Sequence, residues 1–202
     1  MGIRTMHKVT DRDIDTAKRI ALEFHAAVRA NDGDAANEAS RSFRALITKT
    51  NGENGSFGSF ADDGAGTAIT AALAAKAGQE PHWGQNGLFV LETRHGRALV
   101  DFTCPLDICS SFGFTAIDLG LPFISETGYR SHFYMEWPPL SVKEAAAAIF
   151  CEYAEAEKMA NIEIEYRQGR SNSLPDFAKP SWTAFQGIPT QTDNKGQIGF
   201  QF

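Results

Sequence analysis

The sequence predicts an α+β domain in which an N-terminal helical segment packs on a mixed or antiparallel sheet, with one long helix from the C-terminal half on that sheet. Three observations predict it. Apolar residues recur at helical spacing through much of residues 11–50, and residues 87–103 alternate around a tight turn. A capping pattern at Ser141 then opens another helix. Helices and strands grouped in separate runs are typical of the α+β class.

The first fifty residues predict a helical hairpin. Residues 11–30 have an amphipathic pattern, and Thr10, three residues before Asp13, resembles a capping box at the start of this helix. A second helix is expected over 34–49, after the turn-forming Asn-Asp-Gly at 31–33. Because the connection is short, we expect the two helices to be antiparallel neighbours.

The predicted hairpin is also the only positively charged quarter of the chain. The whole chain has 25 Asp or Glu, 19 Lys or Arg and a net charge of −6, whereas residues 1–50 hold nine bases and seven acids. Three of these bases, Arg41, Arg44 and Lys49, fall on or near the outer side of the second helix. The overall charge argues against a general coat protein for duplex DNA, because such binding depends on neutralising phosphates. A local basic surface leaves a nucleic-acid partner open.

A Gly-rich loop over 50–66 leads to a third predicted helix of about 67–78. Asp62 and Asp63 fit the negative first turn that a helix dipole favours, and they would repel a phosphate. Farther on, we expect a β-hairpin with strands over 88–93 and 97–102 and His95 in its turn. Other strands are expected over 114–119, 123–124, 132–137 and 162–166, and a helix is expected over 141–160.

These elements predict one compact unit in three parts. Residues 1–80 form the helical segment, residues 81–170 the sheet core, and residues 171–202 an irregular arm whose aromatic side chains pack back on the domain or onto a partner. No apolar run approaches the roughly 20 residues that cross a bilayer. We therefore expect a cytoplasmic protein without a membrane partner and with an unknown oligomeric state.

Arg130 is the strongest candidate for chemistry. It is the only Lys or Arg over residues 98–142, within an acidic and largely apolar stretch. A buried guanidinium keeps its charge and needs an anion. In one interpretation Arg130 pairs inside the fold, and its candidate partners are Glu126, Asp118 and Asp101.

In the other interpretation the Arg130 fork receives an external phosphate or carboxylate. The catalytic residues would then be Arg130 with Glu126 or Asp101 as general base or metal ligand. The neighbouring groups that would bind the ligand are Thr127, Tyr129, Ser131 and His132. The cofactor is unknown, although phosphate chemistry would add Mg²⁺. No residue pattern predicts a resident metal site.

The three cysteines support a second, weaker enzymatic hypothesis. Cys104 or Cys109 would be the nucleophile of a hydrolase, with His132 or His95 as base. Neighbouring aspartates would raise the pKa of such a thiol, which disfavours the thiolate. Otherwise these two cysteines and Cys151 are reduced thiols that behave as small hydrophobic residues.

The segment Gly128-Tyr129-Arg130-Ser131 resembles the Gly-x-x-Arg phosphate-handling turn of the ParB/sulfiredoxin-like superfamily. That superfamily includes nucleotide hydrolases, nucleases and plasmid fertility-inhibition factors. The resemblance implies an anion-binding role for Arg130 and Ser131. This sequence departs from the pattern because a strand-like run over 132–137 follows, where the superfamily has a helix.

The sequence as a whole favours an accessory or regulatory protein that acts by binding a macromolecule, either a protein or a nucleic acid. The first alternative is an enzyme for phosphate esters, such as a nucleotide hydrolase or nuclease, with Arg130 as anion clamp. The second alternative is the Cys/His hydrolase.

Overall fold

Three helices lead the chain. In the computed structural model, which describes residues 9–51, 64–104, 106, 110–134, 137–156 and 159–179, they are α1 (Asp11–Arg29), α2 (Gly33–Asn51) and α3 (Ala65–Leu73). The predicted capping box forms, because the Thr10 hydroxyl accepts from the Asp13 backbone N–H at 3.3 Å and the Asp13 carboxylate accepts from the Thr10 N–H at 3.0 Å. Asn31 then adopts a φ of 56°, and the Asp32 carboxylate accepts from the Ala35 N–H in the first turn of α2. The chain therefore reverses directly into a helical hairpin.

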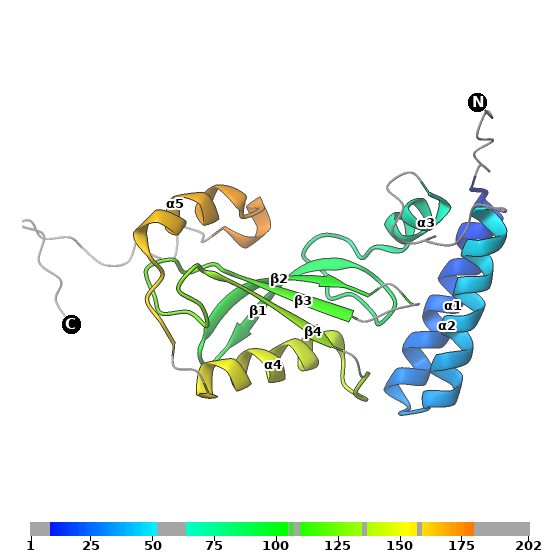
Figure 1. The fold of residues 1–202 in the computed structure, drawn as a ribbon, viewed down its shortest axis with the longest axis horizontal. Helices are drawn as coiled ribbons and strands as arrows, with labels where there is room; N and C mark the ends of the chain where they lie inside the picture. Colours follow the sequence, from blue (N-terminus) through cyan, green and yellow to red (C-terminus); the bar gives the residue numbers. More distant parts are fainter. Residues whose placement is uncertain are drawn as a thin grey trace, which may run out of the picture.

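The sheet has four antiparallel strands in chain order, which confirms the α+β class. They are β1 (Gly87–Thr93), β2 (Gly96–Thr103), β3 (Ser110–Ala116) and β4 (Tyr129–Tyr134). The predicted hairpin is formed by β1 and β2, and Arg94 and His95 make its turn. In Figure 1 the sheet occupies the middle of the molecule, and the α1–α2 hairpin stands at one end.

The two faces of the sheet are covered by different elements. On one face Val100 lies between its cross-strand partners Phe89 and Phe114, and this face packs against α4 (Val142–Ala156), where Phe114 contacts Phe150. On the other face Leu99 belongs to a smaller hydrophobic cluster. The segment that follows α5 (Ile164–Ser173) covers this cluster. Figure 1 shows α4 and α5 on opposite sides of the sheet. The larger cluster also includes buried residues of α1, α2 and α3, so one core joins the helical part to the sheet.

Trp83 is the residue that connects these parts. It is fully buried in the segment between α3 and β1. Its indole Nε1–H donates to the Leu140 carbonyl at 2.7 Å, and its backbone N–H donates to His25 Nδ1 on α1 at 3.2 Å. Its ring packs edge-on against Phe102 and Phe112 of the sheet. One residue therefore contacts the sheet and the start of α4 through its side chain, and the helical hairpin through its backbone.

The position next to Trp83 requires glycine. Gly84 has a φ of +89°, and a Cβ there would lie 2.9 Å from Leu106 Cδ2. Its N–H donates to the buried Cys104 Sγ at 3.3 Å. A side chain at position 84 would be strained by this φ and would require the Leu106 side chain to shift.

Two histidines stack where α1 meets the Trp83 segment. The rings of His25 and His82 lie 4.3 Å apart and nearly parallel. Because His25 Nδ1 accepts from the Trp83 N–H, the neutral ring carries its proton on Nε2. Burial first, and then the nearby His82 and Arg29 charges, lower the pKa of His25, although Glu80 opposes them.

Two predicted strands begin earlier than expected. The strand predicted over 132–137 begins at Tyr129, directly after Gly128 with its φ of +67°. The strand predicted over 114–119 begins at Ser110 and ends at Ala116, because the Ser-Ser-Phe-Gly run pairs with β2. Of the short piece predicted over 123–124, only Phe123 pairs, in an isolated bridge. Serine and glycine have low strand propensity, so this run indicates a loop in the sequence. In the structure, cross-strand pairing overrides that propensity.

The strand predicted over 162–166 is wrong, because α5 occupies most of it. Ile162 is buried, but Ile164 is 81% exposed, so the apolar alternation does not mark one face of a strand. Arg167 Nε donates to the Ile162 carbonyl at 2.9 Å near the start of the helix. Good helix formers such as Glu165, Arg167 and Gln168 favour the helix.

Two predicted helices are shorter than expected. Helix α3 ends at Leu73 instead of 78, because Ala74 leaves the helical conformation and the Ala75 N–H donates to the Asn86 carbonyl beside β1. Helix α4 ends at Ala156 and has 15 residues, so the expected long helix is not confirmed. The predicted cap of α4 is present, since Ser141 and Glu144 exchange hydrogen bonds.

Replacing Trp83 by Phe should lower the free energy of unfolding by about 1–3 kcal/mol, because the Leu140 carbonyl loses its buried donor. Trp137→Phe is a matched control: among the described residues no partner accepts from the buried Trp137 Nε1–H. Urea unfolding followed by circular dichroism measures both variants. Equal losses in the two variants would contradict the proposed role of the Trp83 hydrogen bond.

Acid should destabilise the fold partly through His25. Above its ordinary pKa of 6.5 both states hold a neutral ring. Below pH 6.5 the unfolded chain takes up the proton more readily, because the folded-state pKa is lowered, so the free energy of unfolding falls as the pH falls. His25→Asn keeps an acceptor for Trp83 and does not titrate there. Unfolding curves from pH 7.5 to 5 should show a smaller pH slope in this variant, and an unchanged slope would contradict the assignment.

Candidate nucleic-acid interface

Helix α2 presents a polar stripe on the side opposite the core. Its inward side chains are buried among α1 and α3: Ala36, Ala39, Phe43, Leu46 and Ile47. The opposite side carries four exposed residues at spacings of four, three and four, which form what we call the α2 stripe: Asn37, Arg41, Arg44 and Thr48. At 1.5 Å per residue the stripe is about 16 Å long. The sequence-based prediction included Arg41 and Arg44 but missed Asn37 and Thr48, which the 4-3-4 spacing could have identified.

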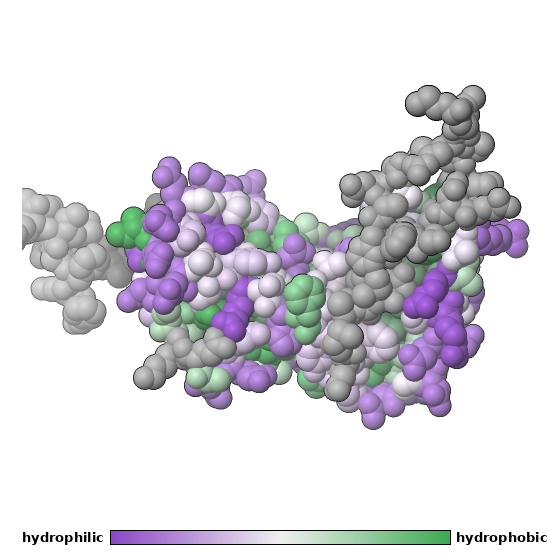
Figure 2. All heavy atoms as spheres, viewed as in Figure 1, coloured by the Kyte–Doolittle hydropathy of each residue, from purple (hydrophilic) through white to green (hydrophobic). Residues whose placement is uncertain are grey.

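The residue types of the stripe suit base edges. Arg donates two hydrogen bonds to guanine O6 and N7, Asn pairs in the same way with adenine, and Thr contacts the thymine methyl group or a phosphate. A single α-helix fits the major groove of B-form DNA. Figure 2 shows hydrophilic side chains gathered over the α1–α2 hairpin.

Most cations of the hairpin already have acidic neighbours. On α2, Arg41 Nη2 lies 2.7 Å from Glu38 Oε2. On α1, Arg19 pairs with Glu23 at 2.7 Å. Both pairs are more than half exposed, and such pairs contribute at most about 1 kcal/mol. A phosphate or base could therefore replace the acid at low cost. Arg44 also interacts within the chain.

Arg130 lies on the α4 side of the sheet. Its guanidinium carbon is 3.8 Å from the centroid of the Tyr153 ring, a cation–π contact, and Arg130 has a further interaction besides. Tyr153 Oη is also 2.8 Å from His132 Nδ1. Burial is the main cause that lowers the pKa of His132; Arg130 lowers it further, and Glu152 opposes both. Arg130, His132 and Tyr153 thus form one cluster where β4 meets α4.

Strand geometry divides the other predicted site residues between two faces. Alternate residues of β4 point to opposite sides, so Tyr129 and Ser131 lie away from Arg130 and His132. Asp101 is on the side of Ser131, since both align with Gly113 in the register. The structure therefore does not bring Asp101 to Arg130. Although Asp101 is exposed as a residue, crowding by protein atoms raises the pKa of its carboxyl group.

The turn before β4 is occupied by structural contacts. The backbone carbonyl of Glu126 accepts from the Glu163 N–H at 2.9 Å, and Glu126 itself is exposed to solvent. The Thr127 carbonyl accepts from Arg170 Nε at 3.1 Å, and Arg170 also lies over the Tyr129 ring at 5.2 Å. These contacts fasten α5 to the sheet.

The acid at position 118, a candidate partner of Arg130, is paired elsewhere. Arg97 holds Asp118 through two hydrogen bonds, of which the Nε bond is 2.9 Å long. This pair raises the pKa of Arg97 further. The use of Arg130 as an anion clamp stays a prediction.

The Cys/His pairs of the hydrolase hypothesis are not assembled among the described residues. Cys104 is buried just beyond the end of β2 and accepts a hydrogen bond from the Ser110 hydroxyl at 3.2 Å. His95 lies before the start of the same strand, next to Glu155 at 3.4 Å. His132 is engaged by Tyr153. Cys109 lies outside the described residues, as do Asp62 and Asp63.

The described part of the chain has neither a cluster of metal-ligating side chains nor a membrane-spanning helix. No group of three or more His, Cys, Asp or Glu side chains there is arranged to hold a metal ion. Within the same residues, every helix is too short or too polar to cross a membrane.

Two segments of the chain match families of known proteins. Residues 10–73 match the family described as the KlcB N-terminal DNA-binding domain, and residues 86–167 match the family described as the KlcB third domain. The first segment coincides with α1, α2 and α3, and the second with the sheet and α4. No solved structure matches the chain.

Curated relatives support both matches. Two proteins of Escherichia coli, each named Protein KlcB, are 40% identical over 181 residues and 30% identical over 163 residues. The alignments cover 86% and 79% of this chain but 44% and 34% of the relatives, so the chain spans less than half the length of either protein. Both segments of this chain therefore resemble parts of KlcB proteins.

Proposed function

We propose that the N-terminal helices bind duplex DNA, with the α2 stripe in the major groove, and that the chain acts as an accessory or regulatory protein through this binding. The observation that carries the proposal is the similarity of residues 10–73 to a domain described as DNA-binding. This segment contains the α2 stripe, which lies exposed on the side of the helix opposite its buried residues.

The charge balance predicts how this binding depends on salt and sequence. The whole chain carries a net charge of −6, which opposes tight nonspecific binding. Contacts from a few arginines to base edges would therefore contribute a large share of the affinity. Specific binding should exceed nonspecific binding most clearly at moderate salt, where nonspecific phosphate contacts are weakened.

Arg41→Ala should weaken binding to a selected DNA site by about 1–3 kcal/mol, roughly 5- to 150-fold, if Arg41 contacts a base. The site can be selected from a randomised duplex library and the Kd measured by fluorescence anisotropy. Arg19→Ala on α1 is the matched control, because Arg19 is also exposed and ion-paired on a helix. It should leave the Kd within about twofold.

Glu38→Gln provides a test in the opposite direction. This change frees Arg41 from its acidic partner and removes a charge that repels phosphate, so we expect tighter binding. Equal effects of Arg41→Ala and Arg19→Ala, or weaker binding by Glu38→Gln, would contradict the assignment of the α2 stripe. Failure to select any DNA site would contradict the function itself.

A further inference from the structure

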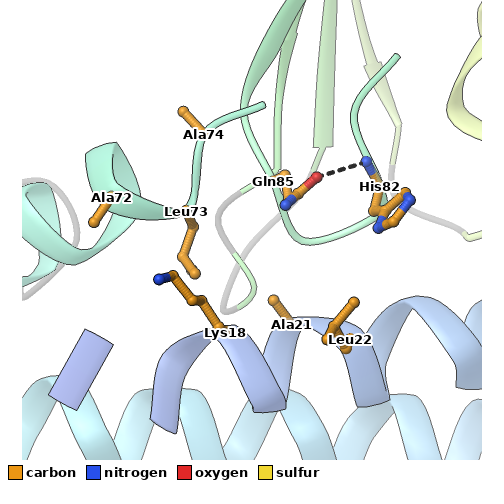
Figure 3. A pocket seen from close by; sticks show the side chains of 8 residues that line it. All are labelled: Lys18, Ala21, Leu22, Ala72, Leu73, Ala74, His82 and Gln85. Atoms are coloured by element: carbon orange, nitrogen blue, oxygen red, sulfur yellow. Dashed lines mark hydrogen bonds between the residues drawn. The ribbon is translucent and has the colours of Figure 1, made fainter. Parts of the chain in front are cut away.

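A groove of about 340 Å³ lies where the helical part meets the segment that leads into the sheet. Helix α1 forms the floor, the end of α3 one wall, and residues 82–85 the other wall (Figure 3). This volume lies within the range of natural small-molecule sites. The groove is distinct from the α2 stripe, which lies on another helix.

The floor of the groove is apolar. Figure 3 shows Ala21 and Leu22 on α1 below the open space, with Leu73 on the side of α3. Leu22 is 55% exposed, one of few large hydrophobic side chains on the described surface with that much exposure. An apolar ligand body on this floor would remove Leu22 from water, which favours binding by about 25 cal/mol per Å².

Two of the polar side chains that border the groove, those of Gln85 and Lys18, can donate hydrogen bonds to a ligand. Gln85 Oε1 accepts from the His82 backbone N–H at 2.9 Å, so the Gln85 amide nitrogen is left as a donor. Figure 3 shows this nitrogen over the space above Ala21. The Lys18 ammonium stands at the other side, where it is 3.8 Å from Asp15 in a pair that is more than half exposed. Such a weak pair leaves Lys18 able to turn to a ligand.

An amide donor and an ammonium around an apolar floor select an acceptor with negative charge. We propose that this groove binds a small amphiphilic anion, with an apolar body on Ala21, Leu22 and Leu73 and a carboxylate, sulfonate or phosphate group that accepts from Lys18 and Gln85. Charge complementarity and the exposed Leu22 carry this assignment. It does not depend on whether the α2 stripe binds DNA.

The probe for this site is 1-anilinonaphthalene-8-sulfonate, whose fluorescence rises in apolar surroundings. Its neutral counterpart, N-phenyl-1-naphthylamine, lacks the sulfonate. Titration of the folded chain should give saturable binding of both, with tighter binding of the anion. Lys18→Gln should weaken the anion about tenfold and leave the neutral probe unchanged, since a charged hydrogen bond contributes about 1.5 kcal/mol. Lys76→Gln, a nearby exposed lysine outside the groove, is the matched control.

Filling the groove tests its position. Ala72→Trp places a large ring in the space from an exposed position and should abolish binding of both probes. If this variant fails to fold by circular dichroism, Leu22→Gln makes the floor polar from another exposed position and should weaken both probes. Absence of saturable binding, equal effects of Lys18→Gln and Lys76→Gln, or undiminished binding in a folded groove variant would each overturn the proposal.

Discussion

The buried Trp83 side chain constrains the arrangement of the helices around the sheet. Its indole N–H reaches the Leu140 carbonyl ahead of α4, its backbone N–H reaches His25 on α1, and its ring lies against Phe102 and Phe112. The ring can stay buried, with its indole and backbone N–H groups both satisfied, only if Leu140, His25 and the two phenylalanines keep these positions. The adjacent glycine, with its positive φ, lets the chain pass close to Leu106 and keeps the ring in the core.

This constraint has two consequences for the surface. It fixes α1 against the segment before β1, so that the apolar floor around Leu22 faces Gln85 across a groove instead of being covered. It also leaves α2 on the outer side of the hairpin, where its polar stripe is exposed (Figure 1). The proposed DNA-binding surface therefore lies on α2, whereas the floor of the proposed ligand site lies on α1. A change at one site does not alter the chemistry of the other directly.

Local signals predicted much of the fold, and long-range contacts explain the errors. The capping residues Thr10 and Ser141 and the β1–β2 alternation marked elements whose stability is encoded by neighbours in sequence. The start of β4 at Tyr129 depends on pairing with Thr115, and the helical state of Ile164 depends on how α5 rests on the turn at Thr127. The division of Arg130 and Ser131 between two faces follows from that strand. The roles of Trp83 and Lys18 depend on residues far away in sequence, which no local pattern reveals.

Native-state hydrogen exchange tests most directly whether the helical part and the sheet share one core. Because buried residues of α1, the sheet and α4 form one cluster, opening α1 should expose the sheet core as well. We expect the slowest amides of α1 and β3 to exchange with the same free energy of opening, and that value should equal the global free energy of unfolding. A clearly lower value for α1, with β3 still protected, would show that the hairpin opens alone and that Trp83 does not unite the two parts.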